Sequence, residues 1–175
     1  MSEDGGFDAR FRRVYESLFP VIYRVALRIT GDTGRAEDLC HEAFLKYFEK
    51  GRNLPDLEQT RYWLIRVVKN LSYNVEKRKA RERTAVERLR RDGPAADRSS
   101  EDVYLARADQ GAVRELLQAL PYNLRVPLVL KEYEGLTYKE IGKILGISEG
   151  NVKVRVFRGR EKLAELFKRG FGDES

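Results

Sequence analysis

The fold of this chain is decided by the stretch Thr137-Tyr138-Lys139-Glu140-Ile141-Gly142-Lys143-Ile144-Leu145-Gly146-Ile147-Ser148. Threonine and glutamate three residues apart form a capping box, which satisfies the free amides at a helix start. Gly146 follows the last apolar turn, at the position where helices commonly end with a left-handed glycine. Ser148 can cap the start of the next helix. Gly142 lies where a second helix must cross closely. This spacing predicts a helix-turn-helix.

The second helix of the pair has two faces of different chemistry. The face expected to pack against the first helix carries Val152, Val156, Gly159 and Leu163. The opposite face carries Asn151, Lys153, Val154, Phe157, Arg158 and Glu161. Cations can hold phosphates, Arg158 can make a bidentate contact with guanine, and Val154 or Phe157 can touch a thymine methyl group. We interpret this face as a reader of duplex DNA; the alternative is a plain helical hairpin whose basic residues are only solvated.

Apolar residues recur at helical spacing along nearly all of the remaining chain, so we expect an all-α protein. Further helices are expected over 11–29, 35–49, from about Thr60 through Val75 into a basic run, and over 104–120 and 121–133. The composition changes to glycine, proline, serine and charged residues from Asp92 onward, which is typical of a linker. We therefore predict two small helical domains, 1–91 and 104–175, joined by a flexible linker over 92–103.

The positive charge of the chain is concentrated in two blocks. The net charge is +6, but residues 61–91 carry 11 basic against 3 acidic side chains and 149–170 carry 7 against 3. One such block alone is best explained as a solvated helix face. Two blocks, each on a helix that also carries asparagine or aromatic residues, favour an anionic polymer as the partner.

Several functional classes find little support in the sequence. No stretch approaches the roughly 18 apolar residues of a membrane span, and the start of the chain is acidic, so we expect no membrane insertion and a cytoplasmic location. The single cysteine and single histidine, Cys40 and His41, rule out an internal disulfide and the usual zinc ligand sets. We predict no metal, no cofactor and no catalytic residue, hence no enzyme. Cys40 is interpreted as a small buried residue.

Five runs of the sequence stand out, residues 36–46, 62–70, 120–125, 132–141 and 150–163. Together they resemble one bacterial family, the extracytoplasmic-function (group 4) sigma factors. Its C-terminal domain is similar to residues 120–125, 132–141 and 150–163. Its segments for polymerase binding and promoter melting are similar to residues 36–46 and 62–70. The C-terminal runs alone would also suit other bacterial regulators, and the N-terminal runs decide for this family. The resemblance implies a factor that binds core RNA polymerase and directs promoter-specific initiation, with the C-terminal domain on the −35 duplex and the N-terminal domain on the −10 strand.

The resemblance implies that the helix over 35–49 docks on the clamp helices of core polymerase. Its expected buried face carries Leu39, Ala43, Phe44 and Tyr47, and its outer face carries Asp38, His41, Glu42, Leu45 and Glu49. An acidic surface around one exposed leucine suits a basic partner helix. Without the resemblance, a solvated helix face would be the better reading. His41 stands where the family often has glutamine, which makes the charge there depend on pH.

The third helix is expected to turn Leu64, Val67, Val68, Leu71 and Val75 inward. Its outer and edge positions carry Tyr62, Arg66, Lys69, Asn70, Tyr73, Asn74, Lys77 and Arg78. Rings beside cations suit single-stranded DNA, because bases stack on rings while phosphates meet the cations. The resemblance implies that this face captures the −10 strand, with a flipped base held partly by loop 51–59. Asn70 is the first candidate for a base contact, and Trp63 is interpreted as a core residue.

Two function classes remain open on the residues alone: a sigma factor, and an independent repressor or activator with the same helix-turn-helix. The acidic face over 38–49 and the aromatic, basic third helix favour the first, because a simple regulator needs neither. Val154 lies where the family commonly has a small polar residue, so promoter preference cannot be copied from a relative. The resemblance also implies an anti-sigma factor as a partner, since a flexible linker lets both DNA-binding surfaces be masked at once.

Overall fold

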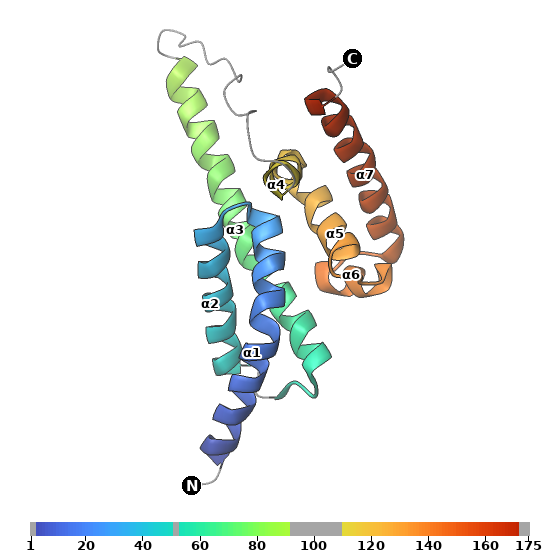
Figure 1. Ribbon diagram of the computed structural model, residues 1–175. Coiled ribbons are helices and arrows are strands. Elements are labelled where there is room, and N and C mark those ends of the chain that lie inside the picture. The colour runs from blue at the N-terminus through green and yellow to red at the C-terminus, as the bar shows by residue number, and fades with distance from the viewer. Residues whose placement is uncertain (1–2, 51–52, 92–109, 172–175) are drawn as a thin grey trace.

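The computed structural model describes residues 3–50, 53–91 and 110–171, and every regular element in these ranges is a helix (Figure 1). The helices are α1 (Glu3–Thr30), α2 (Thr33–Lys50), α3 (Leu57–Arg91), α4 (Gln110–Ala119), α5 (Tyr122–Glu132), α6 (Tyr138–Leu145) and α7 (Glu149–Phe171). The prediction of an all-α protein is confirmed. The expected linker over 92–103 and the segments 104–109 and 172–175 lie outside the described residues, so the domain boundaries stay a prediction.

Helices α1, α2 and α3 pack into an N-terminal unit whose core is apolar. The expected buried face of α2 is confirmed, with Tyr47 fully buried against Phe11 and Trp63. On α3 the inward row differs from the prediction: Ile65 and Ser72 are buried, whereas Val67, Leu71 and Val75 are only half-buried. The reason is that α3 packs against α1 and α2 with its N-terminal half only, so the row ends before Val75. Trp63 packs partly buried against this core, as expected.

The lone cysteine also belongs to this core. Cys40 is fully buried, and its burial raises the pKa of the thiol to about 12. A thiol of this kind stays protonated at neutral pH, which agrees with the interpretation of Cys40 as a small packing residue. None of the helices that the structure describes has the length and apolar character needed to cross a membrane.

Helices α4 to α7 form a C-terminal unit that contains the predicted helix-turn-helix in α6 and α7. Thr137 and Glu140 make both hydrogen bonds of the capping box, and Gly146 is left-handed with φ of 68°. The Asn151 amide donates to the Ser148 hydroxyl at 3.1 Å, so the second cap is also confirmed. A Cβ on Gly142 would lie 2.8 Å from the Ile147 carbonyl oxygen, which explains why only glycine fits beside the turn.

One packing expectation for α7 needs correction. Val152 and Val156 are fully buried, but Gly159 lies against α5, where a Cβ would approach the Leu124 carbonyl oxygen at 3.3 Å. Further along, Leu163 lines an apolar groove formed with α4 and α5. The apolar face of α7 therefore packs on α6 only at its start and on α5 and α4 beyond it, because α6 is just 8 residues long.

The two units lie side by side, with α1 and α3 of the N-terminal unit facing α4, α5 and α6 (Figure 1). The α1–α2 turn takes part in this contact. Gly31 has φ of 69°, and a Cβ there would meet the Gln118 side chain at 2.5 Å. The side chain of Gln118 donates to the Arg28 and Ile29 carbonyl oxygens at 3.1 and 3.2 Å, so a residue of α4 caps the C-terminal end of α1.

Candidate nucleic-acid interface

The first candidate surface is the outer face of α7. All the residues predicted to contact the −35 element are exposed, namely Asn151, Lys153, Val154, Phe157 and Arg158. Burial of Val152 and Val156 on the other side of the helix fixes this orientation. Val154 is 46% exposed and Phe157 is 61% exposed, so two apolar groups stand among cations. This is a suitable arrangement for thymine methyl contacts between phosphate contacts.

Two residues of this face already have polar partners. The Asn151 side-chain oxygen accepts from Arg155 Nε at 3.1 Å, and Lys153 lies 3.5 Å from the Glu149 carboxylate. The pair between Lys153 and Glu149 is exposed and links residues four apart, so it is weak and can give way to a phosphate. Arg158 forms no ion pair with any of the described residues, and its side chain is exposed.

The second candidate surface runs along α3. Six of its eight predicted residues are exposed, with Tyr73 at 50%: Arg66, Asn70, Tyr73, Asn74, Lys77 and Arg78. Burial of Leu64, Ile65 and Val68 against the N-terminal core turns this row outward. The row combines amides, a ring and cations, the groups that hold an unstacked strand.

The start of this surface also contacts the C-terminal unit. The Tyr62 hydroxyl lies 2.6 Å from a Glu140 carboxylate oxygen and 2.7 Å from one of Glu58. These carboxylates raise the pKa of Tyr62, and the bond from Tyr62 in turn lowers the pKa of Glu140. Arg66 donates to the Lys143 carbonyl oxygen at 2.8 Å. Two residues predicted to bind the −10 strand are thus occupied by the helix-turn-helix.

Neighbouring side chains extend this contact between the units. Arg61 donates to the Glu134 backbone at 3.1 Å and lies 3.0 Å from its carboxylate, which is almost buried. The Tyr122 hydroxyl donates to the Lys69 carbonyl oxygen at 2.8 Å, and its ring packs 5.7 Å from that of Tyr73. Burial raises the pKa of Tyr122 to about 12 and lowers that of Lys69. Sequence reasoning missed Arg61, Glu134 and Tyr122, since nothing local marks a partner more than 50 residues away.

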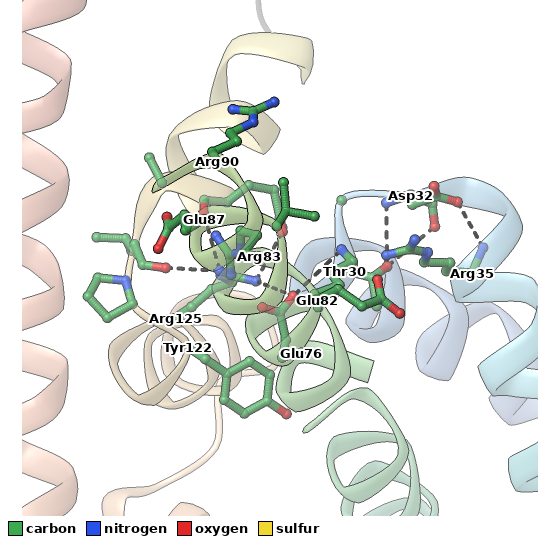
Figure 2. Close-up of a pocket in the computed structure, with 17 residues that line it drawn as sticks. Thr30, Asp32, Arg35, Glu76, Glu82, Arg83, Glu87, Arg90, Tyr122 and Arg125 are labelled. Atoms are coloured by element: carbon green, nitrogen blue, oxygen red, sulfur yellow. Dashed lines mark hydrogen bonds and ion pairs between the residues drawn. The ribbon is translucent and has the colours of Figure 1, made fainter. Parts of the chain in front are cut away.

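A buried arginine of α5 takes part in the contact between the two units, near the C-terminal end of α1. Arg125 is only 4% exposed, and it donates to the Ile29 carbonyl oxygen at 2.7 Å and the Leu120 carbonyl oxygen at 2.9 Å. Figure 2 shows Arg125 beside Glu76 of α3, whose carboxylate lies 3.7 Å away. Desolvation lowers the pKa of Arg125, while Glu76 opposes that shift. The guanidinium therefore links α1, α3 and α5.

A cleft of about 1130 Å³ opens beside this arginine, between the α1–α2 turn, the C-terminal half of α3 and the start of α5 (Figure 2). Its lining mixes both signs of charge: Asp32, Arg35, Glu76, Lys79, Glu82, Arg83, Glu87 and Arg90. With Arg125 the lining has five cations and four carboxylates, interspersed, so the cleft favours no single kind of small charged ligand. It marks the edge of the contact between the units.

The outer face of α2 is the third candidate surface. Its predicted residues are all exposed, namely Asp38, His41, Glu42, Leu45 and Glu49, and Leu45 is 63% exposed. The exposed ring of Phe48 stands beside them, 5.3 Å from that of Phe11. Sequence reasoning missed Phe48, although its position three residues after Leu45 places it on the same side. Glu42 lies 3.9 Å from Lys46, an exposed pair that offsets little of the negative charge.

The segment before α3 belongs to loop 51–59, which was predicted to help hold a flipped base. Gly51 and Arg52 lie outside the described residues. Beyond them, Arg10 of α1 donates to the Leu54 carbonyl oxygen, and the Asp56 carboxylate accepts from the Gln59 amide at 2.7 Å. Asp56 therefore caps α3, and α3 begins at Leu57, three residues earlier than expected.

Comparison with known proteins shows that the two units match two models of one protein family. Residues 14–83 match Sigma-70 region 2, and residues 110–163 match Sigma-70, region 4. The chain is 35% identical over 148 residues to the ECF RNA polymerase sigma factor SigE of Mycolicibacterium smegmatis, covering 82% of this chain and 56% of SigE. This chain thus spans little more than half the length of that relative.

Two further proteins match over nearly their whole length. The ECF RNA polymerase sigma factor SigM of Bacillus subtilis is 30% identical over 165 residues, covering 92% of this chain and 97% of SigM. The sigma factor RpoE of Bartonella quintana, solved in complex with the anti-sigma factor NepR, has a TM-score of 0.69 at 22% identity, over 91% of this chain and 97% of RpoE. The likeness to RpoE shows a shared fold.

Proposed function

Since this chain belongs to the extracytoplasmic-function (ECF) RNA polymerase sigma factors, we propose that it binds core RNA polymerase and directs it to a promoter with two elements. The observation that carries the proposal is the pairing of two different nucleic-acid surfaces in one chain. The α7 face offers cations and apolar groups that suit a major groove, and the α3 face offers amides, rings and cations that suit an unstacked strand. A regulator that only docks on duplex DNA needs the first surface alone.

The proposed role of the C-terminal unit is to read the −35 element. Its α7 would enter the major groove with Asn151, Lys153, Val154, Phe157 and Arg158 on the bases and flanking phosphates. The capping box and the left-handed Gly146 support this role, because they fix the angle between α6 and α7 that presents the outer face.

The proposed role of α3 is to capture the −10 strand through Tyr62, Arg66, Lys69, Asn70, Tyr73, Asn74, Lys77 and Arg78. Binding an extruded base and its neighbours on this face offsets the free energy of unstacking. Asn70 and Asn74 support the role, because both amides are exposed and each can donate to and accept from a base edge.

The proposed role of α2 is to dock on the clamp helices of core polymerase. Leu45 and Phe48 form an apolar centre, and Asp38, Glu42 and Glu49 form an acidic rim. An apolar centre within a charged rim is the arrangement of a specific protein interface. His41 lies among these carboxylates with its ring 5.6 Å from that of Phe19, so it can add a donor to the same surface.

The contact between the units engages part of the α3 surface that is proposed to bind the −10 strand. The Tyr62 hydroxyl and the Nη2 group of Arg66 are hydrogen-bonded to Glu140 and to the Lys143 carbonyl oxygen, so these groups would have to give up those bonds to bind DNA. We therefore propose that the units separate when the chain joins polymerase and promoter. We further propose an anti-sigma factor as a partner that stabilises the closed arrangement, in keeping with the complex of RpoE with NepR.

Replacing Arg158 with alanine should relax the preference at one position of the −35 element. If the guanidinium contacts guanine in a bidentate manner, the change weakens binding to the preferred promoter by about 1–3 kcal/mol. Affinity for promoters that carry another base at that position should stay unchanged. Promoter binding by the chain with core polymerase, measured on a set of single-base −35 variants, checks this. Arg169→Ala, an exposed arginine in the last turn of α7, is the control for loss of charge. An equal loss on every promoter would make Arg158 a phosphate contact.

A further inference from the structure

The C-terminal half of α3 has no core to pack on. The buried residues of α3 end at Ser72, and the residues from Arg81 to Arg91 are all exposed. Figure 1 shows α3 continuing past the ends of α1 and α2 into open space. A helix that is polar on all sides needs many internal ion pairs or a partner to be stable. Within the described residues 76–91, however, only Lys79 and Glu76 form an ion pair with one another, at 3.9 Å.

The carboxylates of this free half all lie on one side of the helix, where cations accompany them. All three of its glutamates, Glu76, Glu82 and Glu87, line the cleft that faces the C-terminal unit, together with Arg83 and Arg90. The opposite side carries three exposed cations at steps of four and seven residues, with Thr84 between the last two and no carboxylate: Lys77, Arg81 and Arg88. Such steps place the three on one row, the cationic stripe, which is about 17 Å long at 1.5 Å per residue.

The cationic stripe is the direct continuation of the surface proposed to hold the −10 strand. Asn70 lies seven residues before Lys77, and Tyr73 and Asn74 lie four and three before it, so they share the same side of α3. Along this line the chemistry changes from amides and a ring to cations, with one hydroxyl, that of Thr84, among them. Amides and rings suit the exposed edges and faces of unstacked bases, whereas a row of cations along a helix suits a line of backbone phosphates. This change in side chains along α3 indicates that single-stranded DNA with accessible bases lies on the part around Asn70, and that duplex DNA with stacked bases lies on the stripe.

We propose that the cationic stripe holds the phosphates of the duplex that adjoins the captured −10 strand, without reading its sequence. This inference rests on the proposed function, because it places the −10 strand on the neighbouring part of α3. The length of the stripe matches a few phosphates along one groove edge, and its lack of carboxylates avoids repulsion along that path. The partner is duplex DNA at its junction with single strand.

The test compares two pairs of arginines on the same helix. Arg81→Gln with Arg88→Gln removes two charges from the stripe, and Arg83→Gln with Arg90→Gln removes two from the cleft side at the same spacing of seven. Each variant, bound to core polymerase, is titrated with two fragments of a promoter that the wild-type complex transcribes. One fragment is the −10 strand alone, and the other is the same strand with its adjoining duplex.

On the fragment with duplex, the stripe variant should lose about two units of the slope of log K against log salt concentration, and bind at least about tenfold more weakly near 0.1 M salt. On the strand alone it should bind like wild type, and the cleft-side variant should bind like wild type on both. Equal losses for the two variants, or a loss by the stripe variant on the strand alone, would overturn the assignment of the stripe to duplex. If the wild-type complex binds neither fragment, the proposed function is wrong, and the assignment of the stripe to duplex DNA is wrong with it.

Discussion

Replacing Arg125 with methionine should lower the free energy of unfolding of the chain by about 3 kcal/mol. Methionine keeps much of the aliphatic volume but donates no hydrogen bond. The carbonyl oxygens of Ile29 and Leu120 would lose a charged donor in a buried place, and Glu76 would lose its opposite charge. An unsatisfied buried acceptor destabilises a fold far more than a missing contact at the surface.

Urea denaturation followed by circular dichroism measures this change. The matched control is Arg160→Met in the same unit, because Arg160 pairs with Glu132 at an exposed site. Loss of that pair should change the free energy of unfolding by less than about 1 kcal/mol. Similar values for the two variants would show that Arg125 does not stabilise the contact between α1, α3 and α5.

Replacing Leu45 and Glu42 together with alanine should weaken binding to core polymerase by about 30- to 100-fold, or about 2–3 kcal/mol. Leu45 is the most exposed apolar side chain of α2 and stands at the centre of its outer face, where an interface gains most from an anchor. Glu42 supplies rim charge that steers a basic partner. Binding of labelled core polymerase to the immobilised chain measures the change.

The control for this double change is Leu89→Ala with Glu82→Ala, which alters the same residue types on the free half of α3. It should leave core affinity within about twofold of wild type. Duplex binding by the C-terminal unit should also persist in the α2 variant, since neither residue lies near α7. Unchanged core affinity in the α2 variant would remove the assignment of that face.

The sequence alone could predict those parts of the structure that local chemistry determines. The capping box at Thr137, the left-handed Gly146 and the cap at Ser148 each involve residues three or four apart, so their spacing is enough to place α6 and α7. The alternation of apolar and charged residues likewise predicted which face of α2 is buried, because a helix of fixed pitch turns such a pattern directly into two faces.

The contact between the units could not be predicted in this way. Arg61 meets Glu134 across 73 positions, and Arg125 meets Ile29 across 96. Such pairs depend on how two finished units dock, and no periodicity in the sequence records a docking geometry. For the same reason Tyr62 and Arg66 were predicted only as strand contacts, whereas the structure shows them bound to the C-terminal unit. The inward row of α3 was assigned too far, to Val75, because apolar spacing does not reveal where the partner helices end.

Run-off transcription with purified core polymerase tests the central claim most directly. The chain should support specific initiation only in the presence of core. Without core it should bind the same duplex promoter weakly, because the α7 face then acts alone while Tyr62 and Arg66, the proposed −10 contacts, are held by the C-terminal unit. Transcripts should start at one site set by the spacing of the two elements. Tight promoter binding by the chain alone, with no core-dependent transcript, would contradict the account and identify an independent regulator instead.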